Sequence, residues 1–573
     1  MSKIILKVFV SIVLLLATSP AWAQIVCPRF APGSVVLPPT DIASQSGALN
    51  VQFNYNTTVD TDGRSLFCFQ TPQGAEGPTL RVNPGDQLNI LAANDVPQGT
   101  PVEQVSNSQN QCGDLEMYTS SLNIHYHGTT VSPDCHQDQV VHTIINSGEQ
   151  FQYSLNFPQY SAAGLYWYHT HVHGIAEATV QGGASGALIV SGIQNIQPVV
   201  AGLPERVLVI RDQPVAGNST PGNTCFGNSN VTPSWDLDIN YVPLEFQAAT
   251  CTYTPAVIEM QAGQQEFWRV ANAGADSILD LQVQYDGVPQ PLQLVALDGV
   301  AINSEDGQQL GSTKTVTDIL LAPAARAEFI VKAPARGQNA SFMTLNIDTG
   351  PDGDVDPPRV VATILTDSPT QLPKVPAQTG QTLPQALPPS QLLGSQMPTI
   401  HRTLYFSEVL SDPTNPNSPT NFFITVDGAT PQLFDPNNPP AITTYQGAVE
   451  DWTIENRAQE NHEFHFHQLH FLVRSQYGFS VPQEIGQFLD MVQVPYSPTG
   501  DAPYPSVTVR LDFRGADVGD FVYHCHILGH EDGGMMAIIR VLASNPSPPG
   551  STAPGSYAPP PMRPIDGPGT TVQ

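Results

Sequence analysis

The chain has 573 residues, with 51 acidic against 21 basic side chains and a formal net charge of −30 at pH 7. Charge of this sign argues against binding to nucleic acid or to an anionic membrane surface, and it suits neutral or cationic partners. Only 13% of the residues are charged, and 54 prolines with 45 glycines are typical of many short strands joined by turns rather than of helices. About 550 residues without a leader peptide predict three or four domains.

The first 23 residues have the pattern of a secretory signal peptide. Lys3 and Lys7 precede an apolar run, and an Ala-Trp-Ala sequence stands just before Gln24. The apolar run is too short for a transmembrane anchor, and no later stretch reaches the required length without charges. We therefore predict a mature chain that begins at Gln24, is exported to the periplasm or the cell exterior, and has no membrane partner.

Three segments of the chain share one pattern. Residues 85–94, 263–272 and 447–456 each begin with glycine, continue as a half-buried strand and end with asparagine. Their starts lie about 180 residues apart, which predicts three copies of one all-β unit of ordinary domain size.

The repeat divides the chain into domains. In the second copy, residues 277–283 contain no histidine, so we expect that domain to bind no catalytic metal and to hold its neighbours in register. The predicted division is a signal peptide over 1–23, domains over 24–192, 193–370 and 399–544, a proline-rich linker over 371–398, and a disordered Pro/Gly-rich tail over 545–573.

Histidines concentrate in four short motifs of the His-X-His type. A histidine-rich buried strand could explain one such motif, but core packing has no reason to produce four. We therefore interpret them as metal ligands. The motif histidines are His125, His127, His169, His171, His462, His465, His467, His524 and His526.

The last motif contains a cysteine and lies close to two further ligand candidates. Cys525 stands between His524 and His526, and His530 and Met535 follow within ten positions. Two imidazoles, one thiolate and a weak thioether are the ligands of a blue-copper centre. Because neighbours on a strand point to opposite faces, His524 and His526 face away from Cys525, toward a second metal site.

All four motifs, in this order, resemble those of the multicopper oxidases, the family of laccases, ascorbate oxidase and bilirubin oxidase. The resemblance covers essentially the whole mature chain. It implies three consecutive cupredoxin-like Greek-key β-barrel domains and four copper ions per chain. The implied ligands are His462, Cys525, His530 and axial Met535 for type 1 copper, His125 and His465 for type 2 copper, and His127, His169, His526 with His171, His467, His524 for the two type 3 coppers.

The resemblance implies an oxidase that takes electrons one at a time from a phenolic or aromatic reductant and reduces O2 to water. Cys525, His524 and His526 would connect the type 1 copper to the three-copper cluster. A metallo-oxidase of Cu(I) or Fe(II), serving metal tolerance, is the alternative, and a non-catalytic copper-binding protein is a weaker one. Only nine methionines, with no Met-rich run to hold Cu(I), favour an organic reductant.

Two carboxylates are candidate proton donors. Glu531 and Asp138 stand where related oxidases carry acids near the cluster, although each could be a solvated loop charge. The third motif departs from the family at Glu463, where laccases usually have proline, and at Gln468, where they have glycine.

Seven cysteines leave one unpaired if the others form disulfides in an oxidising compartment, and Cys525 accounts for that one. Six cysteines allow 15 pairings, and some could be unpaired. Proximity favours Cys112 with Cys135 and Cys225 with Cys251, which leaves Cys27 with Cys68.

Overall fold

The structure, a computed structural model, describes residues 25–104, 112–217, 220–223, 231–304, 307–378, 391–480, 485–515 and 518–543. The predicted signal peptide, the predicted tail, Cys225 and part of the predicted linker lie outside these residues. Within them, helix is confined to α1 (Ala176–Gln181), α2 (Ile193–Ile196), α3 (Leu528–Asp532) and the 3-10 turns η1 (Pro198–Val200) and η2 (Leu393–Ser395). The rest of the regular structure is β, which confirms the predicted class. None of these helices is long and apolar enough to cross a membrane.

The described residues of the N-terminal part form two sheets and two short strand pairs. One sheet has the order β1 (Asp41–Ala43), β4 (Thr79–Val82), β13 (Ser185–Val190), β12 (Gly164–His169), β9 (His125–His127). The other has the order β11 (Gln150–Asn156), β5 (Gln87–Asn94), β2 (Ala48–Val59), β3 (Ser65–Gln70). The pairs are β10 (Thr143–Ile144) with β7 (Cys112–Gly113), and β6 (Pro101–Gln104) with β8 (Glu116–Tyr118).

The middle part also forms two sheets. One has the order β16 (Val242–Pro243), β15 (Trp235–Ile239), β14 (Glu205–Pro214), β18 (Gln265–Asn272), β25 (Arg326–Lys332), β21 (Leu292–Leu297), β22 (Val300–Ala301), with β23 (Lys314–Val316) on β21. The other has the order β17 (Ala256–Glu259), β27 (Arg359–Leu365), β26 (Ala340–Thr344), β19 (Leu279–Tyr285), β20 (Val288–Pro289), with β24 (Ile319–Leu321) on β19. Strands β14 and β18 are buried along nearly their whole length, as expected for strands covered on both faces.

The C-terminal part repeats the arrangement. One sheet has the order β29 (Thr420–Val426), β28 (Ile400–Leu410), β31 (Val449–Asn456), β36 (Ser506–Asp512), β33 (Phe471–Tyr477), β34 (Phe488–Leu489). The other has the order β30 (Ile442–Tyr445), β38 (Met536–Leu542), β37 (Gly519–Cys525), β32 (His462–Phe466), β35 (Met491–Val494). In β31 buried and half-buried residues alternate, the pattern of a strand with one face on the core.

The predicted repeat is visible in the hydrogen bonds of its three asparagines. Each ends a strand, β5, β18 or β31, and donates from its side-chain amide to two backbone carbonyls. Its side-chain oxygen accepts the backbone N–H two residues later. The three starting glycines all have positive φ, between +72° and +102°, so the turn itself favours glycine. Asn94, Asn272 and Asn456 thus close equivalent corners of three similar units.

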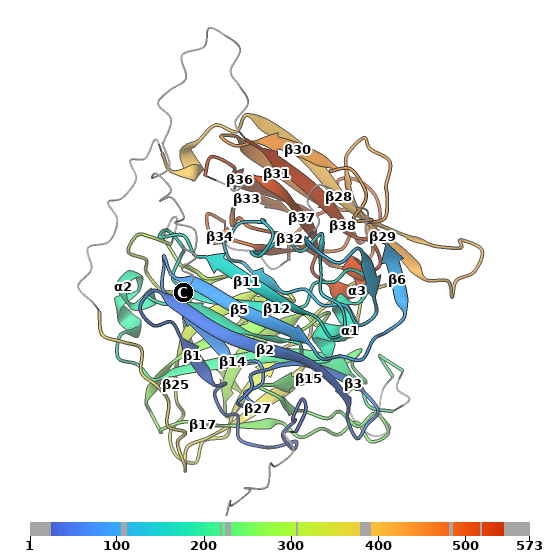
Figure 1. The fold of residues 1–573 in the computed structure, drawn as a ribbon. Coiled ribbons are helices and arrows are strands. Elements are labelled where there is room, and N and C mark those ends of the chain that lie inside the picture. Colours follow the sequence, from blue (N-terminus) through green and yellow to red (C-terminus); the bar gives the residue numbers. More distant parts are fainter. Residues whose placement is uncertain are drawn as a thin grey trace, which may run out of the picture.

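The three parts pack against one another in a fixed arrangement. Figure 1 shows the C-terminal strands (orange to red) above the N-terminal ones (blue to cyan), with the middle part (green to yellow) below. Trp167 of β12 and Ile189 of β13 belong to the same hydrophobic core as the middle strands. At the contact between α1 and α3, the Asp532 carboxylate accepts the backbone N–H groups of Gly174 and Glu177, at 2.6 and 2.9 Å. A carboxylate at these N–H groups stabilises the start of α1 and joins the first part to the third.

Two predicted disulfides are present. Cys27 bonds to Cys68 and Cys112 bonds to Cys135. Cys251 is also disulfide-bonded, while its predicted partner lies outside the described residues. Among the described cysteines, Cys525 is free and buried, as predicted.

Candidate metal centre

Cys525, His462 and His530 form a compact donor set, which we call the thiolate set. Nδ1 of His462 and Nδ1 of His530 lie 3.1 Å apart, and Sγ of Cys525 lies 3.7 Å from each. The pairing of β32 with β37 brings His462 near Cys525, because Phe464, two residues after His462, lies opposite Cys525. The short helix α3 adds His530. Burial raises the pKa of the Cys525 thiol well above its ordinary value, so a cation at this point is needed to keep it ionised.

Met535 lies beside this set. Its side chain is fully buried in the same hydrophobic core as Cys525, and its carbonyl accepts the Cys525 N–H at 3.1 Å. Two imidazoles, a thiolate and a nearby thioether fit copper.

The remaining motif histidines gather in one buried group, which we call the histidine cluster. None of them is more than 2% exposed. Strand pairing places His125 opposite His169 in the first part and His465 opposite His524 in the third. The ring of His125 stacks on that of His467, with the centroids 3.9 Å apart, so the cluster lies where the first and third parts meet. Its members are His125, His127, His169, His171, His465, His467, His524 and His526.

Ring nitrogens in the cluster converge at metal-binding distances. Nε2 of His524 lies 3.3 Å from Nε2 of His171 and 3.1 Å from Nε2 of His467, and these three form one possible metal group. His125 shares one such group with His465 and His467, and another with His127 and His169. The rings of His127 and His526 lie 4.9 Å apart. The structure therefore brings together all eight histidines that the family resemblance assigned to the three-copper cluster.

On most of these rings one nitrogen is held by a hydrogen bond or a carboxylate, while buried nitrogens of several rings have no partner. Nδ1 of His169 and Nδ1 of His465 each contact a backbone carbonyl at 2.8 Å. Their Nε2 atoms, and both nitrogens of His526, are buried without a partner. Burial, reinforced by neighbouring imidazoles, holds the pKa of His526 well below its ordinary value. Neutral rings with orphaned buried nitrogens are suited to binding metal.

Both predicted proton donors contact the cluster. Asp138, buried, lies 3.0 Å from Nδ1 of His125, and burial raises the pKa of this carboxyl well above its ordinary value. Glu531 lies 3.1 Å from Nδ1 of His524 and 3.5 Å from Nδ1 of His171. Burial alone would raise the pKa of Glu531, but the two imidazoles outweigh it and lower the pKa to about 2. Neither group is a solvated loop charge.

Gln468 takes part in this arrangement as well. Its Nε2 donates to Asp138 at 2.7 Å, so the side chain orients the acid beside His125. Its φ of +60° lies in the left-handed region, which favours glycine.

Sequence reasoning missed a buried ion pair that reaches the cluster from the middle part. Asp490 contacts Nε2 of His127 at 3.1 Å and accepts a hydrogen bond of 2.6 Å from Nη1 of Arg326. Nε2 of His470 lies 3.3 Å from the same carboxylate. No motif marks Arg326, because its role depends on the packing of β25 against the third part.

Acidic residues at the thiolate set were missed too. Glu408 lies 3.2 Å from Nε2 of His462, and Glu460 lies 3.3 Å from Nε2 of His530. A pocket beside His530 is also lined by Asp276, Asp354 and Asp356.

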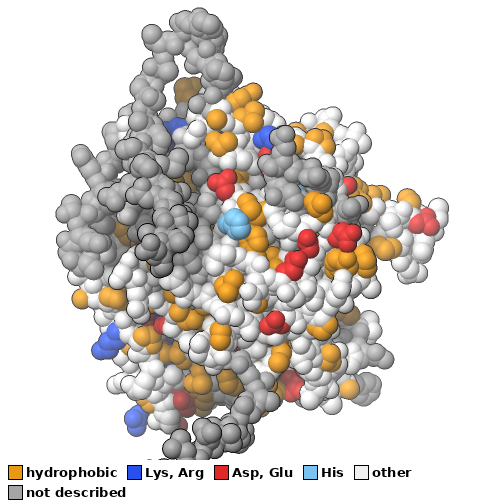
Figure 2. All heavy atoms as spheres, in the orientation of Figure 1, with side chains coloured by type: hydrophobic (Ala, Val, Ile, Leu, Met, Phe, Trp, Pro, Cys, Tyr) orange, Lys and Arg blue, Asp and Glu red, His pale blue; other side chains and the backbone are white. Residues whose placement is uncertain are grey.

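Acidic side chains are common on the rest of the molecule too. Figure 2 shows them (red) spread over one face, where Lys and Arg (blue) are sparse, in line with the net charge. Among so many acids, the sequence had no signal for the two at the thiolate set.

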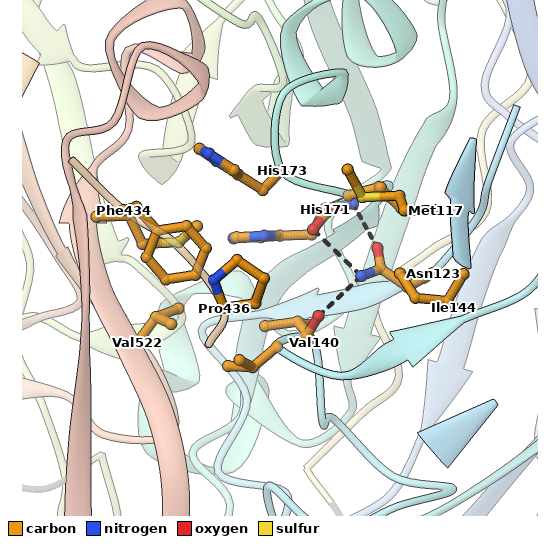
Figure 3. A pocket seen from close by; sticks show the side chains of 12 residues that line it. Met117, Asn123, Val140, Ile144, His171, His173, Phe434, Pro436 and Val522 are labelled. Carbon is orange, nitrogen blue, oxygen red and sulfur yellow. Dashed lines mark hydrogen bonds between the residues drawn. The ribbon is translucent and has the colours of Figure 1, made fainter. Parts of the chain in front are cut away.

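A mostly apolar cavity lies against the histidine cluster at His171. Figure 3 shows His171, His173, Phe434 and Val522 around it. Asn123 donates from Nδ2 to the carbonyl of His171 at 3.2 Å and accepts the His171 N–H at 2.8 Å. The cavity therefore borders His171, a ligand candidate, and Asn123 in the cavity wall holds the backbone of His171 in place.

Comparisons with known proteins agree with this site. Family profiles described as multicopper oxidase match residues 115–195 and 407–545, which contain all four motifs. A multicopper oxidase of Staphylococcus haemolyticus is 22% identical over 494 residues, covering 85% of each chain. A Bacillus subtilis laccase is 22% identical, covering 80% of this chain and 87% of the other.

Solved structures share the fold. A multicopper oxidase from Campylobacter jejuni, described as a metallo-oxidase, superposes with a TM-score of 0.63 at 22% identity, covering 90% of this chain and 96% of that one. The cupredoxin-like architecture is thus confirmed.

Proposed function

The chain belongs to the multicopper oxidase family, and from this premise we propose how it divides the reaction between its two donor sets. It is an oxidoreductase that uses copper and O2. In our proposal the thiolate set receives electrons one at a time, and O2 is reduced to water at the histidine cluster. One observation carries this division: His524 and His526 of the cluster directly flank Cys525 of the thiolate set.

Copper would supply the one-electron redox chemistry, with one ion held at the thiolate set beside Met535 and three in the histidine cluster. The polypeptide positions it. Both flanking histidines are covalently joined to Cys525 through one peptide unit each, so the two sets are held at a fixed separation. Nδ1 of His169 and Nδ1 of His465 are held by backbone carbonyls and Nδ1 of His125 by a carboxylate, which fixes the orientations of these rings.

The chain also supplies protons. Reduction of O2 to two waters consumes four protons with the four electrons, and the histidine cluster is closed to bulk water. Asp138 follows the first motif and Glu531 follows the last, yet both carboxylates contact imidazoles of the cluster. We assign them to proton delivery. The apolar cavity beside His171 suits the passage of O2, which is itself apolar.

The reductant has two candidate classes. The scarcity of methionine favours a phenolic or aromatic reductant over Cu(I). The carboxylates of Glu408 and Glu460 at the thiolate set favour a second candidate, a metallo-oxidase acting on a cation such as Fe(II). Carboxylate oxygens are harder ligands than thioethers, so within that class they favour Fe(II) over Cu(I).

Two measurements on the purified, copper-reconstituted protein test the proposal. Metal analysis should find four copper ions per chain, and one copper or stoichiometric zinc would contradict the assignment. Turnover of a phenol, Cu(I) and Fe(II) by the same sample then decides the reductant class. Export, also proposed, predicts that N-terminal sequencing of the secreted protein starts at Gln24.

A further inference from the structure

The residue after His462 contacts the sulfur of the thiolate set through its backbone. The N–H of Glu463 donates to Sγ of Cys525, with 3.3 Å between nitrogen and sulfur. The carbonyl of Glu463 accepts the N–H of His526 at 2.9 Å. The backbone N–H and carbonyl of Glu463 are therefore both hydrogen-bonded to the segment that carries Cys525.

The side chain of Glu463 makes a different contact. It is fully buried, and Oε1 accepts a hydrogen bond from Nε2 of Gln493 at 3.0 Å on the neighbouring strand β35. The side chain thus packs against β35, while the backbone N–H is directed at β37 and its sulfur. Substitutions can change one contact and keep the other.

This N–H exists only because position 463 is not proline. Proline has no backbone N–H and could not donate to the sulfur. The N–H of Ile527 also donates to Cys525, so Glu463 provides one of the donors on this sulfur.

We propose, on the basis of the proposed function, that the Glu463 N–H raises the reduction potential of the copper bound at the thiolate set. A donor on the sulfur withdraws electron density from the thiolate. The reduced site carries one more negative charge than the oxidised site, so the hydrogen bond stabilises the reduced form more. Hydrogen bonding around the cysteine sulfur is a recognised control of potential in such sites. Glu463 is therefore a tuning residue that acts through Cys525.

The test compares Glu463→Pro with Glu463→Gln. Proline removes the N–H, whereas glutamine keeps the N–H and nearly the same side-chain shape. A redox titration should show the equilibrium constant for reduction falling about tenfold in the proline variant, which is about 59 mV for a one-electron couple. Its sulfur-to-copper absorption should move to longer wavelength, because a sulfur without the donor gives up charge more easily. The glutamine variant should match the wild type in both measurements.

Two results would overturn the inference: a proline variant with wild-type potential, or a glutamine variant shifted as far as the proline one. If proline prevents folding or copper loading, the same titration is made after replacing the Glu463 amide with an ester, which deletes the N–H and keeps the side chain. The same two criteria apply to the ester. A wild-type protein without the blue absorption would instead contradict the proposed function, which separates the two failures.

Discussion

Glu531 lies 3.1 Å from Nδ1 of His524, the residue next to Cys525, although its own neighbour His530 belongs to the thiolate set. The short helix α3 makes this possible, because it turns the chain back so that consecutive residues face different donor sets. One carboxylate is thereby held at the histidine cluster by the segment that also completes the thiolate set.

Replacing Glu531 by glutamine should separate the two halves of the catalytic cycle. Glutamine keeps the size and hydrogen bonding but cannot deliver a proton. Stopped-flow measurements should show normal anaerobic reduction of the blue centre and reoxidation by O2 slowed about a hundredfold. Slowed reduction with normal reoxidation would place Glu531 at the reductant site and leave Asp138 as the proton donor.

Cys525→Ser should abolish the blue absorption and the oxidation of substrate, because a hydroxyl cannot replace the soft thiolate ligand. The histidine cluster does not depend on the sulfur. Metal analysis should therefore find copper falling from four ions to three per chain. A variant that kept its blue colour would show that the copper ligand is a different cysteine.

Met535→Leu should raise the reduction potential at the thiolate set. A thioether ligand stabilises the oxidised ion, and leucine offers no ligand atom. Redox titration measures the shift. The adjacent Met536→Leu is the matched control and should leave the potential unchanged; the opposite outcome would make Met536 the axial residue.

Glu408→Gln should weaken the use of Fe(II) if cations are the reductants. Burial opposes ionisation of Glu408, but the hydrogen bond to His462 outweighs it and holds the pKa of this carboxyl below its ordinary value, so the substitution removes a negative charge. Loss of that charge beside His462 should raise the KM for Fe(II) about fivefold, with a smaller change in kcat. The KM for a neutral phenol should not rise. Asp41→Asn removes an acid paired with Arg81 in the N-terminal sheet and serves as the control. Equal effects on both reductants would argue against a cation site.

Asp490→Asn should destabilise the protein by about 3 kcal/mol, because it leaves the Arg326 guanidinium buried with a weaker partner. Burial opposes ionisation of Asp490, but Arg326 outweighs it and holds the pKa below its ordinary value. This stability is fully present above the ordinary pKa of about 3.9 and is lost as the pH falls through the lowered one.

Thermal and urea unfolding between pH 7 and about pH 2, which extends below the ordinary carboxyl pKa, measure both effects. The wild type should lose stability steeply at the acid end, and Asp490→Asn should lose less because it has no carboxylate there to protonate. Asp427→Asn, at an ion pair whose acid is 54% exposed, should change stability by no more than about 0.5 kcal/mol. Equal effects of the two substitutions would contradict a structural role for the buried pair.

The sequence by itself determined the all-β class, the threefold repeat, the family and which side chains are candidate ligands. It favoured two of the disulfides by proximity without excluding other pairings, and the structure contains both. The features that the sequence determined depend on local patterns. A His-X-His motif on a strand directs both rings to one face, and an asparagine at a strand end closes its own corner, whatever lies farther along the chain. The copper assignments stay predictions, although the structure gathers their residues.

Only the tertiary structure decided what surrounds the ligand candidates. Asp490 meets His127 across 363 positions of sequence, and Arg326 reaches Asp490 from the middle part, which the sequence left without a chemical role. Glu408 and Glu460 are two acids among 51, and nothing in their neighbours marks them. Contacts of this kind arise from the packing of strands that are far apart in the chain. Burial removes water from around the charges and so strengthens the electrostatic interactions between them. No local pattern carries that information.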